Sequence, residues 1–149
     1  MESLKFGKGK VIFAEGVLEN FMFDIVSGSV DIYADYGKAA EKKLVTLKEG
    51  SIFGEMGMVE NQPRSATAVA AERCELNKIT ADEFGEYFKG NPEKAMTVFR
   101  STSHRMRTLT KDYLEVCSCI ARYVKCKEDG TEPDKELMEK LRKIASIKK

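Results

Sequence analysis

One segment of the chain brings together residue types that suit a phosphorylated ligand. It covers residues 53–67 and reads Phe-Gly-Glu-Met-Gly-Met-Val-Glu-Asn-Gln-Pro-Arg-Ser-Ala-Thr. Arg64 is its only cation, and a guanidinium can donate to two phosphate oxygens at once. One helical turn over 54–58 would point free backbone N–H groups at the same phosphate. The backbone N–H groups of Ser65 and Ala66, with the Ser65 hydroxyl, could complete the phosphate site.

The glutamate of this segment suggests the second half of the ligand. Glu55 cannot face a phosphate, because like charges repel. A carboxylate there is better used to accept a hydrogen bond from a hydroxyl, such as a ribose 2′-OH. The two side chains together indicate a ligand with a phosphate and a sugar hydroxyl. A structural salt bridge between Glu55 and Arg64 beside a tight turn fits the spacing equally well.

The length and composition indicate one compact domain, and the small net charge indicates no strong electrostatic field around it. The chain has 149 residues, a formal net charge of +1, one histidine and four cysteines. No apolar run approaches the ~18 residues that span a bilayer, and the N-terminus does not resemble a signal peptide. The cysteines lack the spacing of a disulfide framework, so we expect reduced thiols and a cytoplasmic location without a membrane.

The first eighty residues read as short strands separated by turn residues, which is typical of an all-β sandwich or barrel. A capping box, Thr80-Ala-Asp-Glu83, then predicts a short helix, and Asn91-Pro92 predicts the start of a second. The strands that we predict are 10–13, 21–26, 29–36, 43–47, 52–53, 66–71 and 75–79.

The second helix is predicted to be long, because no glycine or proline occurs between Glu93 and Asp129. It carries a heptad pattern, which favours a parallel homodimer through residues 96–124, although a helix packed on the β-domain remains an alternative. Residues 133–146 form a further amphipathic stripe, too short to supply a DNA-reading domain. The two heptad rows are Phe99, Met106, Tyr113, Ile120 and Thr102, Leu109, Val116, Tyr123.

The segment 53–67 resembles the phosphate-binding cassette of the cyclic nucleotide-binding domain family. The family includes the kinase A regulatory subunit, cyclic-nucleotide-gated channels and bacterial activators of the catabolite activator type. The family cassette runs roughly Phe-Gly-Glu-(Leu/Ile)-(Ala/Gly)-Leu, then a short variable loop, then Pro-Arg-(Ala/Ser/Thr)-Ala-(Thr/Ser). This chain has Phe-Gly-Glu-Met-Gly-Met over 53–58 and Pro-Arg-Ser-Ala-Thr over 63–67. The similarity extends over residues 5–125 and includes Lys8–Gly16, Ile25–Val30 and Asn91-Pro92 before the long helix.

The resemblance implies a fold that is mainly β with α-helices at the C-terminus. It implies an eight-stranded jelly-roll β-barrel, or double-stranded β-helix, followed by a short helix and a long helix. We expect a cyclic nucleotide-binding domain over 1–126, made of a β-roll (4–80), a short helix (81–89) and a lid or dimer helix (92–126). Residues 127–149 would form a linker and a short terminal helix.

The resemblance also implies a ligand, cyclic AMP or cyclic GMP, and the residues that contact it. Arg64 would pair with the cyclic phosphate and Glu55 with the ribose 2′-OH. Activator-type members place a Thr-Ser pair of the long helix against the base, and Leu109-Thr110 stands there, so only Thr110 keeps a hydroxyl. The expected ligand-binding residues are Gly54, Glu55, Met56, Arg64, Ser65, Ala66 and Thr110.

Two departures from the family pattern carry further expectations. Ser65 does not separate the two nucleotides, because threonine at this position often accompanies cyclic GMP and alanine cyclic AMP. Asp24 replaces an apolar strand residue, and we interpret it as facing solvent. Little precedes the first predicted strand, so the family's N-terminal helix is expected to be absent or minimal.

The sequence favours a binding protein over an enzyme. With one histidine, His104, outside the β-region, neither a catalytic triad nor a cupin-type metal site has enough ligands. We interpret Cys117, Cys119 and Cys126 as small buried apolar residues and expect no metal and no cofactor. We expect a stand-alone sensor that passes a signal through its C-terminal helices to a separate protein. The alternative is a non-catalytic dimerisation module, related to transcription regulators, with weak or no nucleotide binding.

Overall fold

The fold was analysed in a computed structural model, which describes residues 1–146. The chain divides into two compact units, Met1–Phe99 and Arg100–Lys149. The last three residues of the tail expected over 127–149 lie outside the described part.

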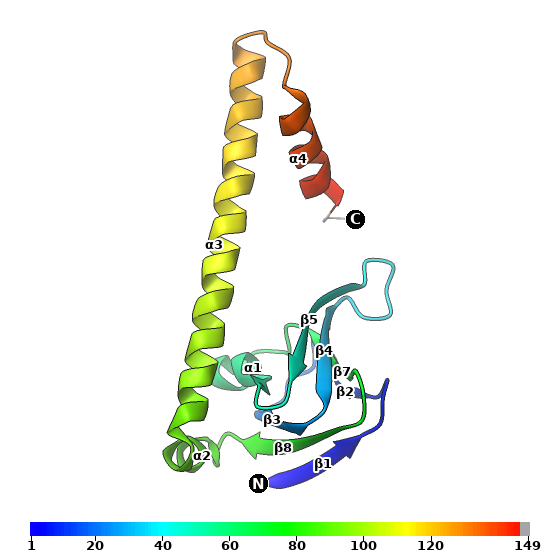
Figure 1. The fold of residues 1–149 in the computed structure, drawn as a ribbon, viewed down its shortest axis with the longest axis vertical. Coiled ribbons are helices and arrows are strands. Elements are labelled where there is room, and N and C mark those ends of the chain that lie inside the picture. The colour runs from blue at the N-terminus through cyan, green and yellow to red at the C-terminus, as the bar shows by residue number, and fades with distance from the viewer. Residues whose placement is uncertain (147–149) are drawn as a thin grey trace. The chain divides into compact units, whose positions relative to one another are not determined.

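The first unit consists of two four-stranded antiparallel sheets (Figure 1). One sheet has the order β1-β8-β3-β6 and the other the order β2-β7-β4-β5. The prediction of a mainly β, eight-stranded fold is confirmed, but the sheets do not close into a barrel. The strands are β1 Glu2–Phe6, β2 Val11–Phe13, β3 Phe21–Ser27, β4 Ser29–Ala34, β5 Lys42–Lys48, β6 Ile52–Phe53, β7 Thr67–Ala70 and β8 Cys74–Thr80.

The first strand, β1, is not among the seven strands predicted from the sequence. It pairs with β8 in a register that places Leu4 opposite Leu76 and Phe6 opposite Cys74. Leu4 and Phe6 are its two half-buried residues, and the residues around them are exposed. Such a short apolar signal in a polar segment is too weak to identify a strand without its partner.

The space between the sheets is filled by an apolar cluster with aromatic rings at its centre. The ring of Phe53 lies 5.7 Å from that of Phe13 and 5.5 Å from that of Phe23. Phe23 and Ile25 of β3 point into this cluster, as the alternation of a strand requires. The buried members are Phe13, Phe23, Ile25, Val30, Phe53, Ala68, Ala70, Cys74 and Leu76.

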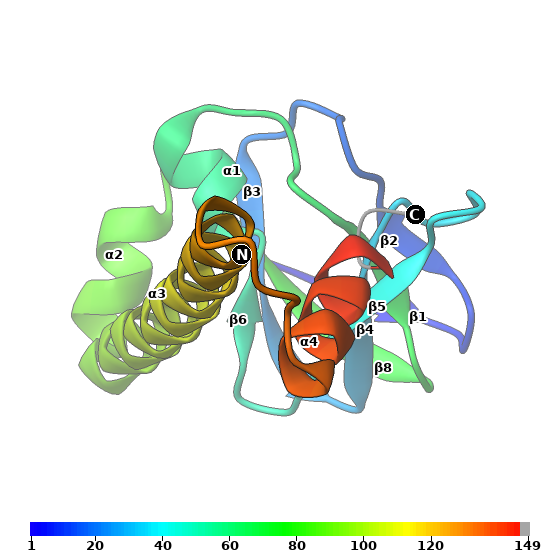
Figure 2. The same ribbon diagram turned by 90° about the horizontal axis from the view of Figure 1, so that it is seen from above.

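The opposite face of β3 is also covered, which contradicts the interpretation of Asp24 as facing solvent. Met22 is fully buried and Asp24 is only 7% exposed. Met22 belongs to a second cluster, which includes residues of α1 (Glu55–Glu60), α2 (Phe84–Gly90) and the start of α3 (Pro92–Glu128). Figure 2 shows α1 and α2 on the same side of the sheets. The prediction was wrong because it treated β3 as a strand with one solvated face.

The short helix α2 begins at Phe84, three residues after the predicted start at residue 81. Glu83 accepts hydrogen bonds from the backbone N–H of Thr80 at 3.0 Å and from its hydroxyl at 3.1 Å. The carboxylate half of the predicted capping box therefore forms. Pro92 is the first residue of α3, as predicted, and α3 runs for 37 residues to Glu128.

The second unit contains the rest of α3 and α4 (Lys135–Ser146), which form an antiparallel helical hairpin (Figure 1). The helix break at Asp129-Gly130 is confirmed, with Gly130 at φ 67°. Asp134 accepts from the Leu137 N–H at 2.7 Å, which caps α4, and it also pairs with Arg122 at 2.7 Å. Leu137 and Cys119 are both buried in this hairpin. None of the helices described is long and apolar enough to cross a membrane.

Candidate functional site

The candidate site begins where β6 ends and the backbone turns into α1. Gly54 has φ +80°, a left-handed conformation that side-chain-bearing residues rarely adopt. A Cβ on Gly54 would lie 2.8 Å from Nη1 of Arg64 and 3.3 Å from the ring of Phe13. Glycine is therefore needed here for both its conformation and its small size.

The loop after α1 carries the chain back toward Gly54. Asn61 adopts a left-handed conformation with φ 50°, and the Gln62 N–H donates to the Gly57 carbonyl at 3.0 Å. The backbone of Arg64 is fixed from both sides, since its N–H donates to the Val17 carbonyl and its carbonyl accepts from the Gly16 N–H, each at 2.9 Å. The local turn therefore fixes the starting point of the arginine side chain.

The guanidinium of Arg64 is buried, with the residue only 3% exposed. It donates to the carbonyls of Gly54 and Phe21 at 2.6 Å each, and its Nε lies 3.4 Å from a Glu19 carboxylate oxygen. Its central carbon lies 4.3 Å from the ring centre of Phe13 and 4.9 Å from that of Phe21. Because the rings cover the guanidinium, a ligand would reach it at an N–H edge.

The hydrogen bonds of Arg64 leave part of its donor capacity unused. A guanidinium has five N–H groups, and these bonds use one each on Nε, Nη1 and Nη2. Among the described residues, one N–H on each terminal nitrogen is left without a protein acceptor. Two donors on neighbouring nitrogens are the arrangement that suits two oxygens of one phosphate.

The charge of Arg64 is acted on by burial and by two carboxylates. Burial lowers the pKa of its guanidinium, while the charge and hydrogen bond of Glu19 and the charge of Glu55 raise it. The group remains a cation at neutral pH, since its ordinary pKa is far above 7. A buried cation with two free donors is a physically suitable partner for a singly charged phosphate diester.

The other cassette residues lie around this guanidinium with different exposures. Glu55 is the first residue of α1 and is only 8% exposed, whereas the Met56 side chain is exposed. Ser65 is exposed and Ala66 is buried, at the entry to β7. The structure thus brings Gly54, Glu55 and Arg64 together in the first unit.

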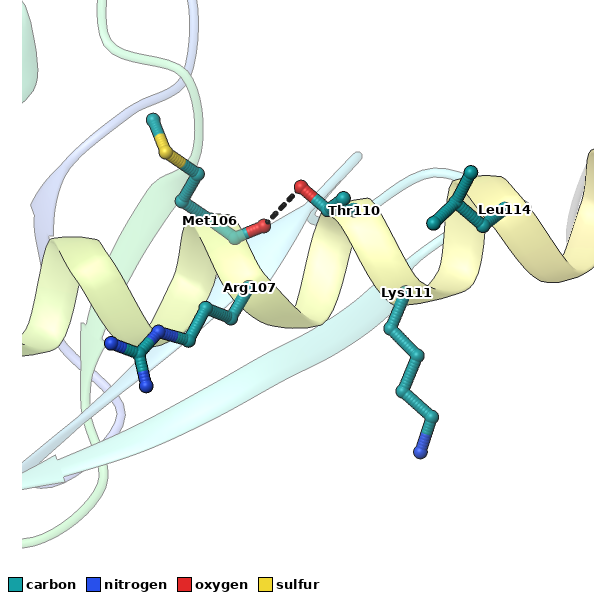
Figure 3. A pocket seen from close by; sticks show the side chains of 5 residues that line it. All are labelled: Met106, Arg107, Thr110, Lys111 and Leu114. Atoms are coloured by element: carbon teal, nitrogen blue, oxygen red, sulfur yellow. Dashed lines mark hydrogen bonds between the residues drawn. The ribbon is translucent and has the colours of Figure 1, made fainter.

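Thr110 lies on α3 in the second unit, where its hydroxyl donates to the Met106 carbonyl of its own helix at 2.9 Å. It lines an open groove of about 420 Å³ on α3. The other lining residues are Met106, Arg107, Lys111 and Leu114, and Figure 3 shows Arg107 and Lys111 on the opposite side of the helix ribbon from Met106, Thr110 and Leu114. A role for Thr110 at the base stays a prediction.

The sequence did not predict two contacts of Arg64. Glu19 is an acidic partner of Arg64 from 45 residues earlier, and Phe21 supplies a carbonyl from β3. Backbone acceptors have no sequence signature, and an acidic residue in a turn has no spacing that marks it as a partner. The alternative prediction was a salt bridge between Arg64 and Glu55 within the cassette. In the structure, Arg64 forms an ion pair with Glu19, which lies outside the cassette.

The cysteines and the histidine form no site in the described part of the chain. No group of three or more His, Cys, Asp or Glu side chains there could hold a metal ion. Cys119 is buried as predicted, but Cys117 is exposed and Cys126 is half-buried, so the interpretation of all three as buried was wrong. Cys117 is exposed because α3 turns it away from the hairpin face that contains Cys119.

Comparison with known proteins identifies the family. Residues 3–91 match the family described as the cyclic nucleotide-binding domain. The chain belongs to this family, as the cassette predicted. The fold just described, with two sheets and a long C-terminal helix, is that of its relatives.

Individual relatives come from regulators of several kinds. The chain is 30% identical over 100 residues to the cyclic AMP receptor protein of Thermus thermophilus. The aligned region covers 67% of this chain and 46% of that protein. The structure of the Thermus thermophilus catabolite activator protein aligns with a TM-score of 0.67 and 27% identity, over 79% of this chain and 55% of that one. The chain therefore spans about half the length of these relatives.

A third relative is known with either nucleotide. The EAL enzyme Bd1971 aligns in its cAMP-bound form with a TM-score of 0.54 and 31% identity, over 85% of this chain and 34% of that one. Its cGMP-bound form aligns with a TM-score of 0.55 and 29% identity, over 87% and 34%. The names of these relatives describe regulators and proteins with bound cyclic nucleotides.

Proposed function

We propose that this chain is a cyclic nucleotide sensor that binds its ligand at the cassette and passes the signal on through its C-terminal helices. The observation that carries the proposal is Arg64, a buried cation with two unused N–H donors in a turn that only glycine at position 54 permits. The family assignment supports the same ligand class. The protein acts as a regulator without catalysis, and its cytoplasmic location stays a prediction.

In this proposal each cassette residue has one task. Arg64 donates to the cyclic phosphate through its free N–H groups, and Glu55 accepts from the ribose 2′-OH. The backbone at Gly54, Met56, Ser65 and Ala66 surrounds the phosphate and ribose. Thr110 contacts the base, and both cyclic AMP and cyclic GMP fit the cassette. The names of relatives with each nucleotide support treating both as candidates.

The helix α3 supports the further proposal of a homodimer. Phe99, Met106, Leu109 and Tyr113 are each 67–68% exposed, although they form the predicted apolar rows. A large apolar surface on a helix is stabilised when a second copy covers it. Nearer the end of α3, Val116 is half-buried and Tyr123 is 36% exposed, and α4 contacts this part through Lys140–Glu115 and Arg122–Asp134. The exposed rows therefore favour pairing through the earlier part of the range 96–124.

The partner that receives the signal is proposed to be a separate protein, without direct DNA binding by this chain. A second candidate function is a dimerisation module with weak or no nucleotide binding. The exposed rows of α3 favour it, because they would serve a dimer whether or not a nucleotide binds. Ligand binding separates the two candidates.

A thermal-shift screen of the whole chain with cyclic AMP and cyclic GMP tests the sensor proposal. Ligand at about 1,000 times its Kd stabilises a protein by about 4 kcal/mol. For a domain of this size, that raises Tm by roughly 8–16 °C. No shift with either nucleotide at millimolar concentration would reject the sensor and favour the dimerisation module.

Light scattering of Leu109→Lys tests the dimer, with Thr108→Lys as the matched control on a neighbouring position of the same helix. Leu109 lies on an apolar row and Thr108 does not. We expect a dimer for the parent chain and for Thr108→Lys, and a monomer for Leu109→Lys. A parent chain that is already a monomer would reject the dimer.

A further inference from the structure

A buried carboxylate lies behind the cassette, on the face of β3 opposite the main core. Asp24 accepts from the Tyr87 hydroxyl at 2.7 Å and from the Lys94 ammonium at 2.7 Å, one on each oxygen. Tyr87 belongs to α2 and Lys94 to the first turn of α3. One side chain of the sheet therefore binds both helices that follow it. We call Asp24, Tyr87 and Lys94 the polar latch.

The polar latch also contacts the strand that leads into the cassette. Lys94 lies 3.3 Å from the Gly50 carbonyl, and Gly50 is in the turn just before β6. Within the sheet, Asp24 pairs with Ile52 of β6, and Gly54 follows two residues later. A displacement of this turn or of β6 would therefore act directly on Asp24 and Lys94.

An apolar cluster connects the same elements around the polar latch. Its members come from β3, β6, β8 and all three helices of the first unit, so α1 of the cassette packs in one cluster with α2 and α3. Apolar contacts are not directional and can slide, whereas hydrogen bonds fail when distance or angle changes. The cluster members are Met22, Ile52, Met58, Ile79, Phe84, Tyr87, Phe88 and Val98.

Both partners of Asp24 are hydrogen-bond donors. Burial raises the pKa of Tyr87 well above its ordinary value, as do its hydrogen bond to Asp24 and the charge of Asp24. Tyr87 therefore remains a donor at neutral pH. Lys94 supplies the positive charge, so the polar latch is satisfied only while both helices keep their positions on β3.

We propose that the polar latch couples the cassette to the C-terminal helices, with Asp24, Tyr87 and Lys94 as positioning residues. This inference rests on the proposed cyclic nucleotide binding. Ligand contact at Gly54 and Glu55 moves β6 and α1, and the directional bonds of the polar latch transfer that movement to α2 and to the first turn of α3. The apolar cluster alone would absorb part of the movement by repacking.

Hydrogen–deuterium exchange of the whole chain, with and without cyclic AMP or cyclic GMP at saturation, tests this coupling. In the parent protein, we expect ligand to change exchange in α1 and, by about fivefold or more, in α2 and the start of α3. In the triple variant Asp24→Leu, Tyr87→Phe, Lys94→Met, the change in α1 stays and the change in α2 and α3 is strongly reduced. Removing all the polar groups together leaves no unpaired buried charge, which favours folding.

Two further variants make the outcome decisive. Tyr87→Phe alone keeps the ring in the cluster and removes one hydrogen bond, and we expect it to reduce the helix response if the triple variant does not fold. The matched control is Lys89→Met, which removes an exposed lysine of α2 that pairs with Glu86 on the surface, and it should respond as the parent does.

The failures are distinguishable. No nucleotide-dependent change in the parent would overturn the proposed function and this inference together. Normal binding with an unchanged helix response in both latch variants would overturn the polar latch alone. Loss of nucleotide binding in the triple variant while it remains folded would also overturn it, because the residues would then act on the ligand site itself.

Discussion

Two buried charges on either side of β3 differ in how far the protein satisfies them. Asp24 receives a short hydrogen bond on each carboxylate oxygen, from Tyr87 and from Lys94. Arg64 donates to two carbonyls and lies at the limit of hydrogen bonding to Glu19, with an N–H to spare on each terminal nitrogen. Burial of a charge alone therefore does not mark a ligand site, and the unused hydrogen-bonding capacity does.

The two charges are linked through one strand. The carbonyl of Phe21 accepts from Arg64, and Asp24 follows three residues later in β3. The strand therefore contacts the cassette with its backbone and the helices with a side chain. This arrangement puts recognition and transmission on neighbouring positions of the same element.

The largest effect on stability should come from breaking the fully satisfied charge. Lys94→Met leaves the Asp24 carboxylate buried with one partner. Removing one member of a buried ion pair costs about 3–5 kcal/mol, and we expect the free energy of unfolding to fall by that amount in urea denaturation. Lys89→Met, which removes a surface pair, should change it by less than about 0.5 kcal/mol. If both variants lowered the free energy of unfolding equally, Asp24 would be solvated, and its contrast with Arg64 would not hold.

A smaller effect should follow from changing the turn that admits Arg64. Gly54→Ala places a Cβ in a left-handed conformation, which costs roughly 1–2 kcal/mol, and 2.8 Å from Nη1 of Arg64. We expect lower stability together with weaker nucleotide binding, because the guanidinium must shift. Gly85→Ala, where a Cβ meets nothing within 4 Å, is the control. Unchanged nucleotide affinity in Gly54→Ala would show that the position of Arg64 does not matter to the ligand.

The smallest effect concerns a third buried carboxylate, Asp31, on the other sheet. Burial raises its pKa, but hydrogen bonds from Lys43 and Thr46 and the charge of Lys43 bring it below the ordinary 3.8. A carboxylate with a lowered pKa stabilises the fold at neutral pH, and this contribution is lost as pH falls below about 4. The free energy of unfolding of Asp31→Asn should therefore depend less on pH between about 5 and 2 than that of the parent. Identical pH profiles would show that Asp31 is not stabilised by its partners.

The family could be predicted from the cassette because its motif is local, although spacing alone left a structural salt bridge as an equal alternative. Gly54, Glu55 and Arg64 lie within eleven residues, and their types follow from backbone conformation and charge. The start of α3 at Pro92 was likewise predicted from a short capping signal, whereas α2 begins at Phe84, after the Thr80–Glu83 capping box rather than within it. These features need no knowledge of distant contacts.

The features that the sequence did not predict depend on contacts between distant segments. Asp24 is buried because α2 and α3, more than 60 residues later, cover the outer face of β3. Glu19 reaches Arg64 only because the turn before β3 lies beside the cassette. The strand β1 becomes recognisable once β8 pairs with it. The openness of the sheets is likewise a matter of distant pairing, since β1 and β6 are the edges of one sheet and β2 and β5 those of the other.

Calorimetric titration of Arg64→Ala with cyclic AMP and cyclic GMP tests the central claim most directly. Arg73→Ala, a change at an exposed arginine of the same unit, is the matched control, and circular dichroism confirms that both variants are folded. If Arg64 binds the phosphate, its loss should cost roughly 2–5 kcal/mol of binding free energy, or about 30- to 4,000-fold in Kd, while Arg73→Ala binds as the parent does. An Arg64→Ala variant that is folded and titrates like the parent would contradict the account.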